Sequence, residues 1–358
     1  MQQKSLDLDH KVNDSVHNLD AFRQIGDDKA DHLVEHLMTS GQPSELYNFL
    51  KAESWQDVVD LQIKDQQFTK FIYTGNELPD WANLKKMNNA SALFRSNGNE
   101  FLFMLGIVSL PYCYAAAKGA IALYHTEKIR KNTEKRLLDT TSFIIDIMRK
   151  EAFANEGHGF LVVKQVRLRH AVARYHLQNI EGIKKLNEMP VNQEDMAGTN
   201  LAFSYVALKA MPLIGVNIPT ETQNDYLHFW GVIGFLLGLN SDLIALDLKS
   251  AFWLEKRIAH RQFRSSAEGL ALTEKLVSHY KDQIPNKMTT LMIKPLMRRL
   301  LGDEIAKIIG LEGNVKFNPL DKVMALLPIF KKYIFPPVQS FEDITKQIHL
   351  RQKQFADK

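Results

Sequence analysis

The spacing of the apolar residues constrains the fold of this chain most strongly. Apolar side chains recur every three or four residues from Leu19 to Leu50, and amphipathic segments of the same period run from residue 242 to the C-terminus. No part of the chain alternates apolar and polar residues over several segments, as the strands of a sheet would. The pattern therefore predicts an all-α fold with almost no sheet.

The length of the chain leaves room for one large or two ordinary domains, since it has 358 residues. No internal repeat or low-complexity linker divides it. We therefore expect a single large helical domain over residues 19–358, preceded by a flexible polar segment over residues 1–18. Clusters of turn residues between positions 40 and 99 predict several short helices there.

Composition narrows the classes of partner. The formal charge of +4 and the pI of 8.8 come from scattered residues without a basic, aromatic-rich patch, so no nucleic-acid partner is expected. Peripheral membrane contact and the oligomeric state stay open. The first ten residues include acids and lack the apolar stretch of a secretory signal, which favours a cytoplasmic protein, although a chain trimmed of its leader would look the same.

The segment Phe101–Ala117 is uncharged over 17 residues and contains Gly106 and Pro111. It is shorter than the roughly 20 residues that a spanning helix needs. We interpret it as a buried helix that bends at Pro111, with a transmembrane helix as the alternative.

The stretch Gln165–Leu177 carries the first candidate for chemistry. On a helix, Val166, His170, Ala173 and Leu177 share one stripe, which is apolar except for the histidine. A neutral imidazole among apolar groups is the proximal ligand that a haem iron requires. The alternative is a core histidine bonded to a backbone carbonyl.

Two arginines flank the same stripe. Arg167 and Arg174 lie together on one side of His170. Guanidinium groups bind carboxylates in a bidentate manner, so these two are predicted to hold the haem propionates. Because Cys113 is the only cysteine, C-x-x-C-H attachment is excluded and any haem would be non-covalent in that sense.

A second polar site is predicted on the segment Arg136–Met148. Arg136 and Thr140 share a helix face with Phe143 and Ile147, and Asp139 borders it. The two polar residues could line a ligand pocket. Alternatively, Arg136 pairs with a carboxylate and Thr140 bonds to a carbonyl one turn earlier.

Two further patterns have functional and structural interpretations. Trp230 precedes small residues at 231, 234 and 238, which would let a flat cofactor or another helix come close. The spacing H-x-x-E-H over His32–His36 can bind zinc, or can be a solvated helix face. Glycine-rich dinucleotide and phosphate loops, the G-x-S-x-G elbow and paired E-x-x-H di-iron motifs are absent from the sequence.

Six stretches in this order and spacing resemble the oxygenase family that joins latex clearing protein, a rubber oxygenase, with the mpaB-type membrane-associated oxygenases of fungi. The likeness spans roughly residues 20 to 300, and the stretches are Pro79–Ala82, Ser109–Tyr114, Lys135–Thr140, Val166–Ala171, Pro190–Asp195 and Trp230–Gly234. The resemblance implies an all-helical fold with a globin-like core that encloses a b-type haem.

The resemblance also implies roles for individual residues. The family's proximal histidine falls on His170, and its arginine and threonine, four residues apart, fall on Arg136 and Thr140. Asp139 stands where the rubber oxygenase has a lysine that caps the distal iron site. The family's glutamate base has no clear match, since Ala120 falls near its place and Glu127 is the nearest carboxylate. Both departures argue against rubber as the substrate.

The expectation is therefore a haem-dependent oxygenase that acts with dioxygen on an apolar, unsaturated small molecule or polymer, for which isoprenoids are one candidate class. His170 is the predicted iron ligand, Arg136, Thr140 and Asp139 are the predicted catalytic residues, and Arg167, Arg174 and Trp230 are predicted to contact the cofactor. The alternatives are a haem sensor or carrier without turnover and a haem-free helical scaffold.

Overall fold

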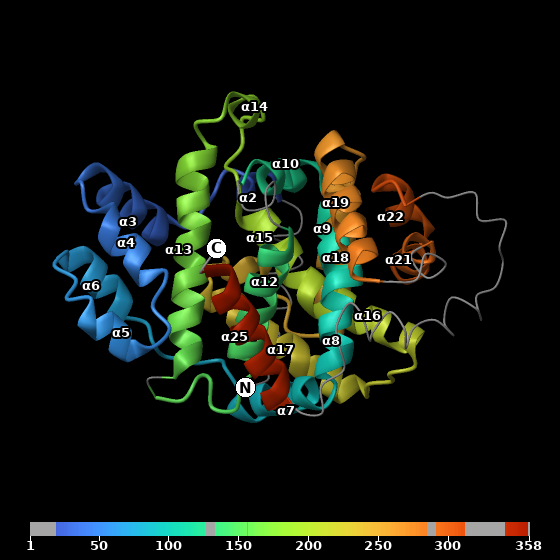
Figure 1. The fold of residues 1–358 in the computed structure, drawn as a ribbon, viewed down its shortest axis with the longest axis horizontal. Helices are drawn as coiled ribbons and strands as arrows, with labels where there is room; N and C mark the ends of the chain where they lie inside the picture. The colour runs from blue at the N-terminus through green and yellow to red at the C-terminus, as the bar shows by residue number, and fades with distance from the viewer. Residues whose placement is uncertain (1–18, 127–132, 156, 285–290, 312–340, 357–358) are drawn as a thin grey trace.

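The computed structural model describes residues 19–126, 133–155, 157–284, 291–311 and 341–356 (Figure 1). Over these residues the chain forms a single helical domain without an assigned strand, and an isolated bridge joins Ala116 to Phe263. The predicted all-α fold is confirmed. The segment predicted to be flexible, residues 1–18, lies outside the described residues, as does Glu127.

The N-terminal part is a group of short helices joined by turns, as the sequence predicted. They are α2 (Leu19–Phe22), α3 (Asp28–Thr39), α4 (Pro43–Phe49), α5 (Trp55–Asp60) and α6 (Gln66–Tyr73). Gly41 and Gly75 follow α3 and α6 with φ of 78° and 68°, a region that glycine enters without steric cost. In Figure 1, α3 to α6 lie together on one side of the long helix α13 (His158–Leu177).

The uncharged segment crosses the centre of the molecule. It follows α7 (Leu84–Ser96) and consists of α8 (Gly98–Met104), the π-helical turn η2 (Leu105–Ser109) and α9 (Leu110–Tyr114), which leads to α10 (Ala117–His125). The segment is a buried helix, as predicted, and its π turn precedes Pro111. The bend predicted at Pro111 stays a prediction. None of the described helices is long and apolar enough to cross a bilayer.

The middle of the chain supplies the remaining core helices. They are α12 (Thr133–Ile147), α13, α14 (Glu181–Lys184), α15 (Gln193–Leu201), the π turn η3 (Ala202–Val206), α16 (Ala207–Ala210), the 3₁₀ turn η4 (Met211–Ile214) and α17 (Thr220–Leu236). The Asn192 side chain caps α15 by accepting a hydrogen bond from the Asp195 amide at 3.0 Å. The helix that α15 begins changes to a 3₁₀ turn at Met211, beside Pro212.

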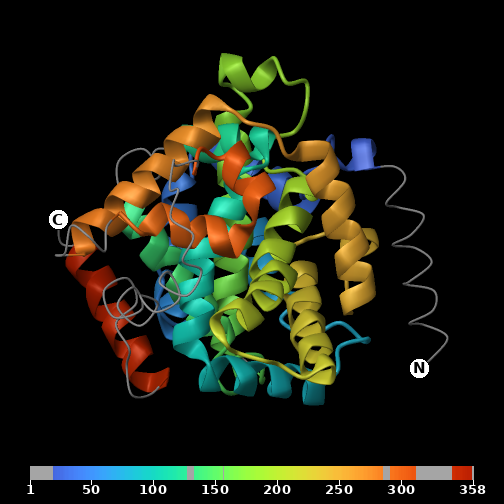
Figure 2. The ribbon, with the colours of Figure 1, turned by 90° about the vertical axis from the view of Figure 1, so that its right-hand side faces the viewer.

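The C-terminal helices surround this core in both views (Figures 1 and 2). They are the 3₁₀ turn η5 (Ser241–Leu243), α18 (Leu248–Gln262), α19 (Ala267–Gln283), α21 (Ile293–Leu301), α22 (Asp303–Ile308) and α25 (Phe341–Ala356). The main core lies between the segment from α8 to α9 and the segment from α15 to α17. A second, smaller core joins α3 to α6 with the buried side of α13.

Candidate functional site

The predicted site is centred on α13, which is fixed by buried polar side chains in its first half. Lys164 donates hydrogen bonds to the carbonyl oxygens of Phe71 and Thr74 at 2.9 and 2.7 Å. Burial lowers the pKa of Lys164 to about 8, and the charge of Arg167 acts in the same direction. Gln165 donates to two further loop carbonyls at 2.8 Å. These bonds tie α13 to the short N-terminal helices.

His170 lies one helical turn beyond these anchors. Its Nδ1 atom is buried and has no hydrogen-bond partner among the described residues. Burial, followed by the charge of Arg174, lowers the pKa of the ring to about 4, so the imidazole is neutral at pH 7. No backbone carbonyl of the described residues accepts a hydrogen bond from Nδ1. This nitrogen therefore does not make the bond that the alternative, a core histidine bonded to a carbonyl, requires. A neutral, partly buried imidazole with an unused nitrogen is chemically suited to bind iron.

The stripe that carries His170 continues into a small apolar cluster. Leu177 is buried with Ala122 of α10 and Ile183 of α14, and Ala173 packs against them. The cluster brings α10 and the second half of α13 together. The stripe that carries His170 therefore ends in an apolar contact between α10, α13 and α14.

Arg167 and Arg174 both bind carboxylates of the protein itself, which belong to helix α3 and to its N-cap residue. The Arg167 guanidinium forms a bidentate ion pair with Asp27, with 2.8 Å between the Nη2 and Oδ1 atoms. Arg174, which is 2% exposed, donates from Nε to Asp31 at 2.6 Å and from Nη1 to the carbonyl of Val191 at 3.0 Å. The role of the two arginines toward propionates stays a prediction, since protein carboxylates fill those positions here.

Arg136 and Thr140 lie on α12, which packs beside α13. Arg136 donates from Nη1 to the hydroxyl of Tyr114 at 2.9 Å, and its guanidinium carbon lies 5.4 Å from the centre of that ring. Thr140 donates to the carbonyl of Arg136 at 2.9 Å, which was the structural alternative for this residue. The tyrosine partner of Arg136 was not anticipated from the sequence. Burial raises the pKa of Tyr114, although Arg136 opposes the shift, so the hydroxyl keeps its proton at pH 7.

Asp139 connects α12 to α13 electrostatically. Burial lowers the pKa of Arg169, the residue before His170, and the charge of Asp139 opposes that shift. Of the three predicted residues on α12, Asp139 therefore interacts with the helix that carries His170, whereas Arg136 binds Tyr114 and Thr140 binds its own helix. Their catalytic roles stay predictions.

Trp230 lies deep in α17, where its side chain is 2% exposed. Its ring stacks on Phe203, with 5.8 Å between centroids. The neighbouring glycines let protein come close: a Cβ atom on Gly231 would lie 2.5 Å from the side chain of Leu246. Gly238, with φ of 85°, would place a Cβ atom 2.3 Å from Asp27. Close protein packing accounts for these small residues, and a cofactor contact for Trp230 stays a prediction.

The paired histidines of the zinc-like motif have separate protein partners. His32 Nδ1 lies 2.7 Å from the carbonyl oxygen of Asp28, and His36 Nε2 lies 2.7 Å from the carboxylate of Asp65. Within the described ranges, no group of three or more histidine, cysteine or carboxylate side chains could hold a metal ion.

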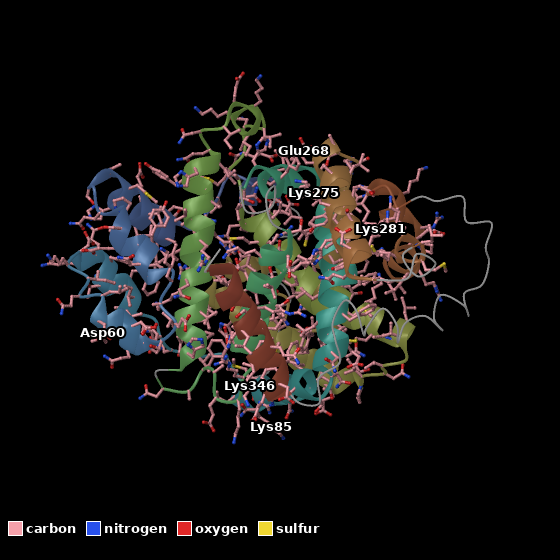
Figure 3. The ribbon with its side chains drawn as sticks, viewed as in Figure 1. Asp60, Lys85, Glu268, Lys275, Lys281 and Lys346 are labelled. Carbon is pink, nitrogen blue, oxygen red and sulfur yellow. The ribbon has the colours of Figure 1, made fainter. Side chains whose placement is uncertain are left out.

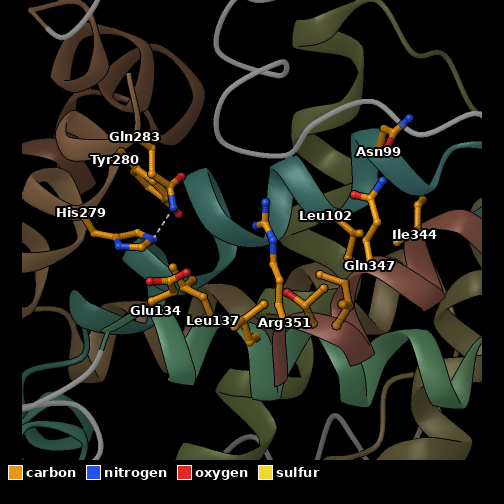
Figure 4. A pocket seen from close by; sticks show the side chains of 13 residues that line it. Asn99, Leu102, Glu134, Leu137, His279, Tyr280, Gln283, Ile344, Gln347 and Arg351 are labelled. Carbon is orange, nitrogen blue, oxygen red and sulfur yellow. Dashed lines mark hydrogen bonds between the residues drawn. The ribbon is translucent and has the colours of Figure 1, made fainter. Parts of the chain in front are cut away.

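A cavity of about 60 Å³ opens on the flank of α12 away from Arg136 and Thr140. Figure 4 shows its polar side at His279, Tyr280 and Gln283, above Leu137. About two water molecules fill such a volume. The cavity is therefore too small for a tetrapyrrole, and we do not assign it to the site around His170.

A buried ion-pair network was missed by the sequence analysis. Glu194 is fully buried and accepts hydrogen bonds from Arg23, Arg261 and Gln262 at 3.1, 3.0 and 2.9 Å. The first-turn position of Glu194 indicated only a favourable contact with the helix dipole. Its partners are 67 to 171 residues away along the chain, so no local signal could have identified them.

A second buried polar pair joins α9 to α18. The hydroxyl of Tyr112 donates to Glu255, whose Oε2 atom has no partner among the described residues. Burial and the Glu255 carboxylate raise the pKa of Tyr112. Glu255 lies on the buried side of an amphipathic helix, and this position was the available signal for its role.

Comparisons with known proteins agree with this architecture. Among curated proteins, the rubber oxygenase of Streptomyces sp. (strain K30) is 22% identical over 319 residues, which cover 87% of this chain and 77% of that protein. Among solved structures, latex clearing protein in the closed state has a TM-score of 0.72 and 20% identity, with 91% of this chain and 90% of that chain covered. The second comparison shows a shared fold.

The family itself is shown by a match to its catalytic domain. Residues 98–326, more than half of the chain, match the family described as ER-bound oxygenase mpaB/B'/rubber oxygenase, catalytic domain. The match includes α8 to α19 and therefore both helices of the candidate site. The chain therefore belongs to the oxygenase family that contains mpaB and rubber oxygenase.

Proposed function

We propose that this protein is a haem b-dependent oxygenase that acts with dioxygen on the C=C bond of an apolar, unsaturated substrate. One observation carries the proposal. In a chain of an oxygenase family, His170 presents a neutral imidazole whose Nδ1 atom has no partner among the described residues. A buried polar atom without a partner costs about 1–3 kcal/mol of folding free energy. Such an atom therefore calls for an explanation, and a function is one.

The residues around His170 fit a haem group in their chemistry. His170 would hold the iron, and the apolar cluster at Ala173 and Leu177 would contact the macrocycle. Haem iron, when bound, supplies the redox chemistry that lets dioxygen react with an alkene. Arg167 and Arg174 would hold the propionates in place of the aspartates that they bind in this structure.

The predicted residues on α12 would contribute a fixed positive charge and hydrogen bonds that hold it in place. Arg136 keeps a positive charge in the site, and its hydrogen bond to Tyr114 fixes the direction of the guanidinium. A fixed cation stabilises negative charge that develops on reacting oxygen atoms, more strongly where water is excluded. The bond from Thr140 to the carbonyl of Arg136 stabilises the same helical turn. Asp139 would orient a water molecule or balance the charge of the arginines.

The substrate class follows from the relatives. The Streptomyces relative is named for rubber, an unsaturated hydrocarbon polymer. For this chain we propose an apolar alkene, with isoprenoid chains as the first class to test. Asp139 replaces the lysine of the rubber oxygenase, so rubber itself is not the substrate that we favour.

The experiment begins with the absorbance of the purified protein after haem is supplied. We expect a Soret band for the wild type, and His170→Ala is expected to abolish haem retention while the helical circular dichroism is unchanged. The matched control is His176→Ala, since His176 is an exposed histidine on the same helix. Full haem content in His170→Ala, or equal loss in both variants, would contradict the ligand assignment.

The enzymatic part of the proposal is tested separately. The reduced, haem-loaded protein is mixed with dioxygen and isoprenoid alkenes, and oxygen consumption and carbonyl products are measured. We expect consumption that depends on the alkene and falls at least tenfold in Arg136→Met. A stable oxygenated spectrum without consumption would identify a carrier instead, and a protein that takes up no haem would be a helical scaffold.

A further inference from the structure

The outward side of α18 carries an unusual combination of side chains. Trp253 is 51% exposed and Phe252 is 36% exposed, and the two rings contact each other with 5.1 Å between centroids. Lys249, Lys256 and Arg257 are exposed on the same helix. We name these five residues the α18 face. The helix lies near the right-hand edge of the ribbon in Figure 2.

Helix geometry places these residues on one side. At 100° per residue, the α18 face spans about 140° of the helix circumference. The opposite side is formed by Ala251, Leu254 and Ile258, which are buried in the main core. The aromatic pair and the three cations therefore project outward together, and core packing does not require them.

The charge of this face has a single sign. Glu255 is the only acidic residue within α18, and it is buried and bonded to Tyr112. None of Lys249, Lys256 and Arg257 forms an ion pair with another described residue. At the C-terminal end of the helix, Asp20 and Glu194 are both paired with Arg261. Cations and exposed aromatic rings thus stand side by side without compensating carboxylates.

We propose that the α18 face binds the surface of an anionic phospholipid bilayer as a peripheral contact. Tryptophan and phenylalanine side chains insert at the boundary between headgroups and acyl chains, while lysine and arginine bind the anionic headgroups. The proposal does not depend on haem binding or on the activity of the site at His170.

Two other occupants fit this face less well. A second copy of the chain would bring three cations against three cations across a twofold axis, which costs free energy. A neutral hydrocarbon polymer would contact the two rings but would leave the cations without partners. Anionic headgroups satisfy both kinds of side chain.

The test is co-sedimentation of the full chain with vesicles of phosphatidylcholine, with and without phosphatidylserine. We expect binding to the anionic vesicles, weakened by added salt, and a blue shift of tryptophan emission. In the triple variant Lys249→Glu, Lys256→Glu and Arg257→Glu, binding is expected to fall by at least roughly a hundredfold, since each basic residue near the surface contributes about fivefold and each new glutamate is repelled by the anionic headgroups. Trp253→Ala is expected to remove the blue shift and weaken binding.

A matched control reverses three exposed lysines elsewhere, Lys85, Lys281 and Lys346, which Figure 3 labels on other parts of the surface. This variant has the same net charge and is expected to bind within about threefold of the wild type, because charges beyond a Debye length of the membrane contribute little. Circular dichroism checks that every variant is folded.

Four outcomes would overturn the proposal. These are no sedimentation with anionic vesicles, equal binding to neutral vesicles, and an equal loss of binding in the control variant. The fourth is self-association in solution that Trp253→Ala abolishes while vesicle binding is unchanged, which would assign the face to a second copy. Haem loading is measured in the same samples, so a failure of the proposed activity leaves these results interpretable.

Discussion

The environment of His228 predicts that the free energy of unfolding of this protein depends strongly on pH. Its side chain is 5% exposed on α17, and its Nε2 atom accepts a hydrogen bond from the backbone N–H of Asn83 at 2.9 Å. The Trp81 ring packs edge-on against it, with 5.7 Å between centroids. Burial, followed by the charge of Lys86, lowers the pKa of His228 to about 4. A proton on Nε2 would break the bond to Asn83 and bury a charge.

The magnitude follows from linkage. An unfolded histidine titrates near 6.5, whereas folded His228 titrates near 4. Between these values the unfolded chain binds a proton that the folded chain does not, so the free energy of unfolding decreases as pH falls from about 6.5 to about 4. At about 1.4 kcal/mol per pKa unit, the loss amounts to roughly 3 kcal/mol. Above pH 6.5 this contribution is fully present.

The assay is urea unfolding at several pH values from 7 to 4, followed by circular dichroism. In His228→Gln the amide oxygen can accept the Asn83 bond but cannot ionise. We expect this variant to lose roughly 3 kcal/mol less than the wild type between pH 7 and pH 4. The control is His260→Gln, at an exposed position of α18. If His228→Gln and the wild type show the same pH dependence, the reasoning is wrong.

Two further substitutions test the packing around the site. Gly238→Ala is expected to destabilise the fold by about 2 kcal/mol or more, because φ is 85° and the new methyl group would lie 2.3 Å from Asp27; a change within about 0.5 kcal/mol in urea unfolding would refute this. Tyr112→Phe removes the donor to the buried Glu255 and is expected to cost about 1–3 kcal/mol. Thermal melting measures this loss, and an unchanged Tm would show that the pair contributes nothing.

Periodicity and turn chemistry were sufficient to predict the fold class and several local features. The spacing of apolar residues predicted helices, and the uncharged segment around Pro111 was recognised as a buried helix. The π turn itself was not predictable, because it depends on how the neighbouring turn η3 packs against it. The features that were predicted correctly all depend on contacts between residues that are close along the chain.

The candidate site was predicted less completely, for the same physical reason. The roles predicted for His170, Arg167 and Arg174 stay predictions, and the two arginines bind carboxylates of the protein itself. Those partners, Asp27 and Asp31, are 140 and 143 residues away along the chain. A helical pattern shows which side a residue faces, but not which distant element meets it there. The tyrosine bound to Arg136 was missed for this reason.

The helix α13 contributes residues to two hydrophobic clusters, so a substitution that disturbs one cluster can also affect the other. Leu161, Leu168 and Ala171 anchor the small N-terminal core, while Leu177 is buried in the apolar cluster beside His170. A helix is stiff along its axis, so a shift on one side is transmitted to the other. A cavity created among the short N-terminal helices would therefore displace the imidazole of His170, so a substitution there would alter the surroundings of a ring that it does not contact.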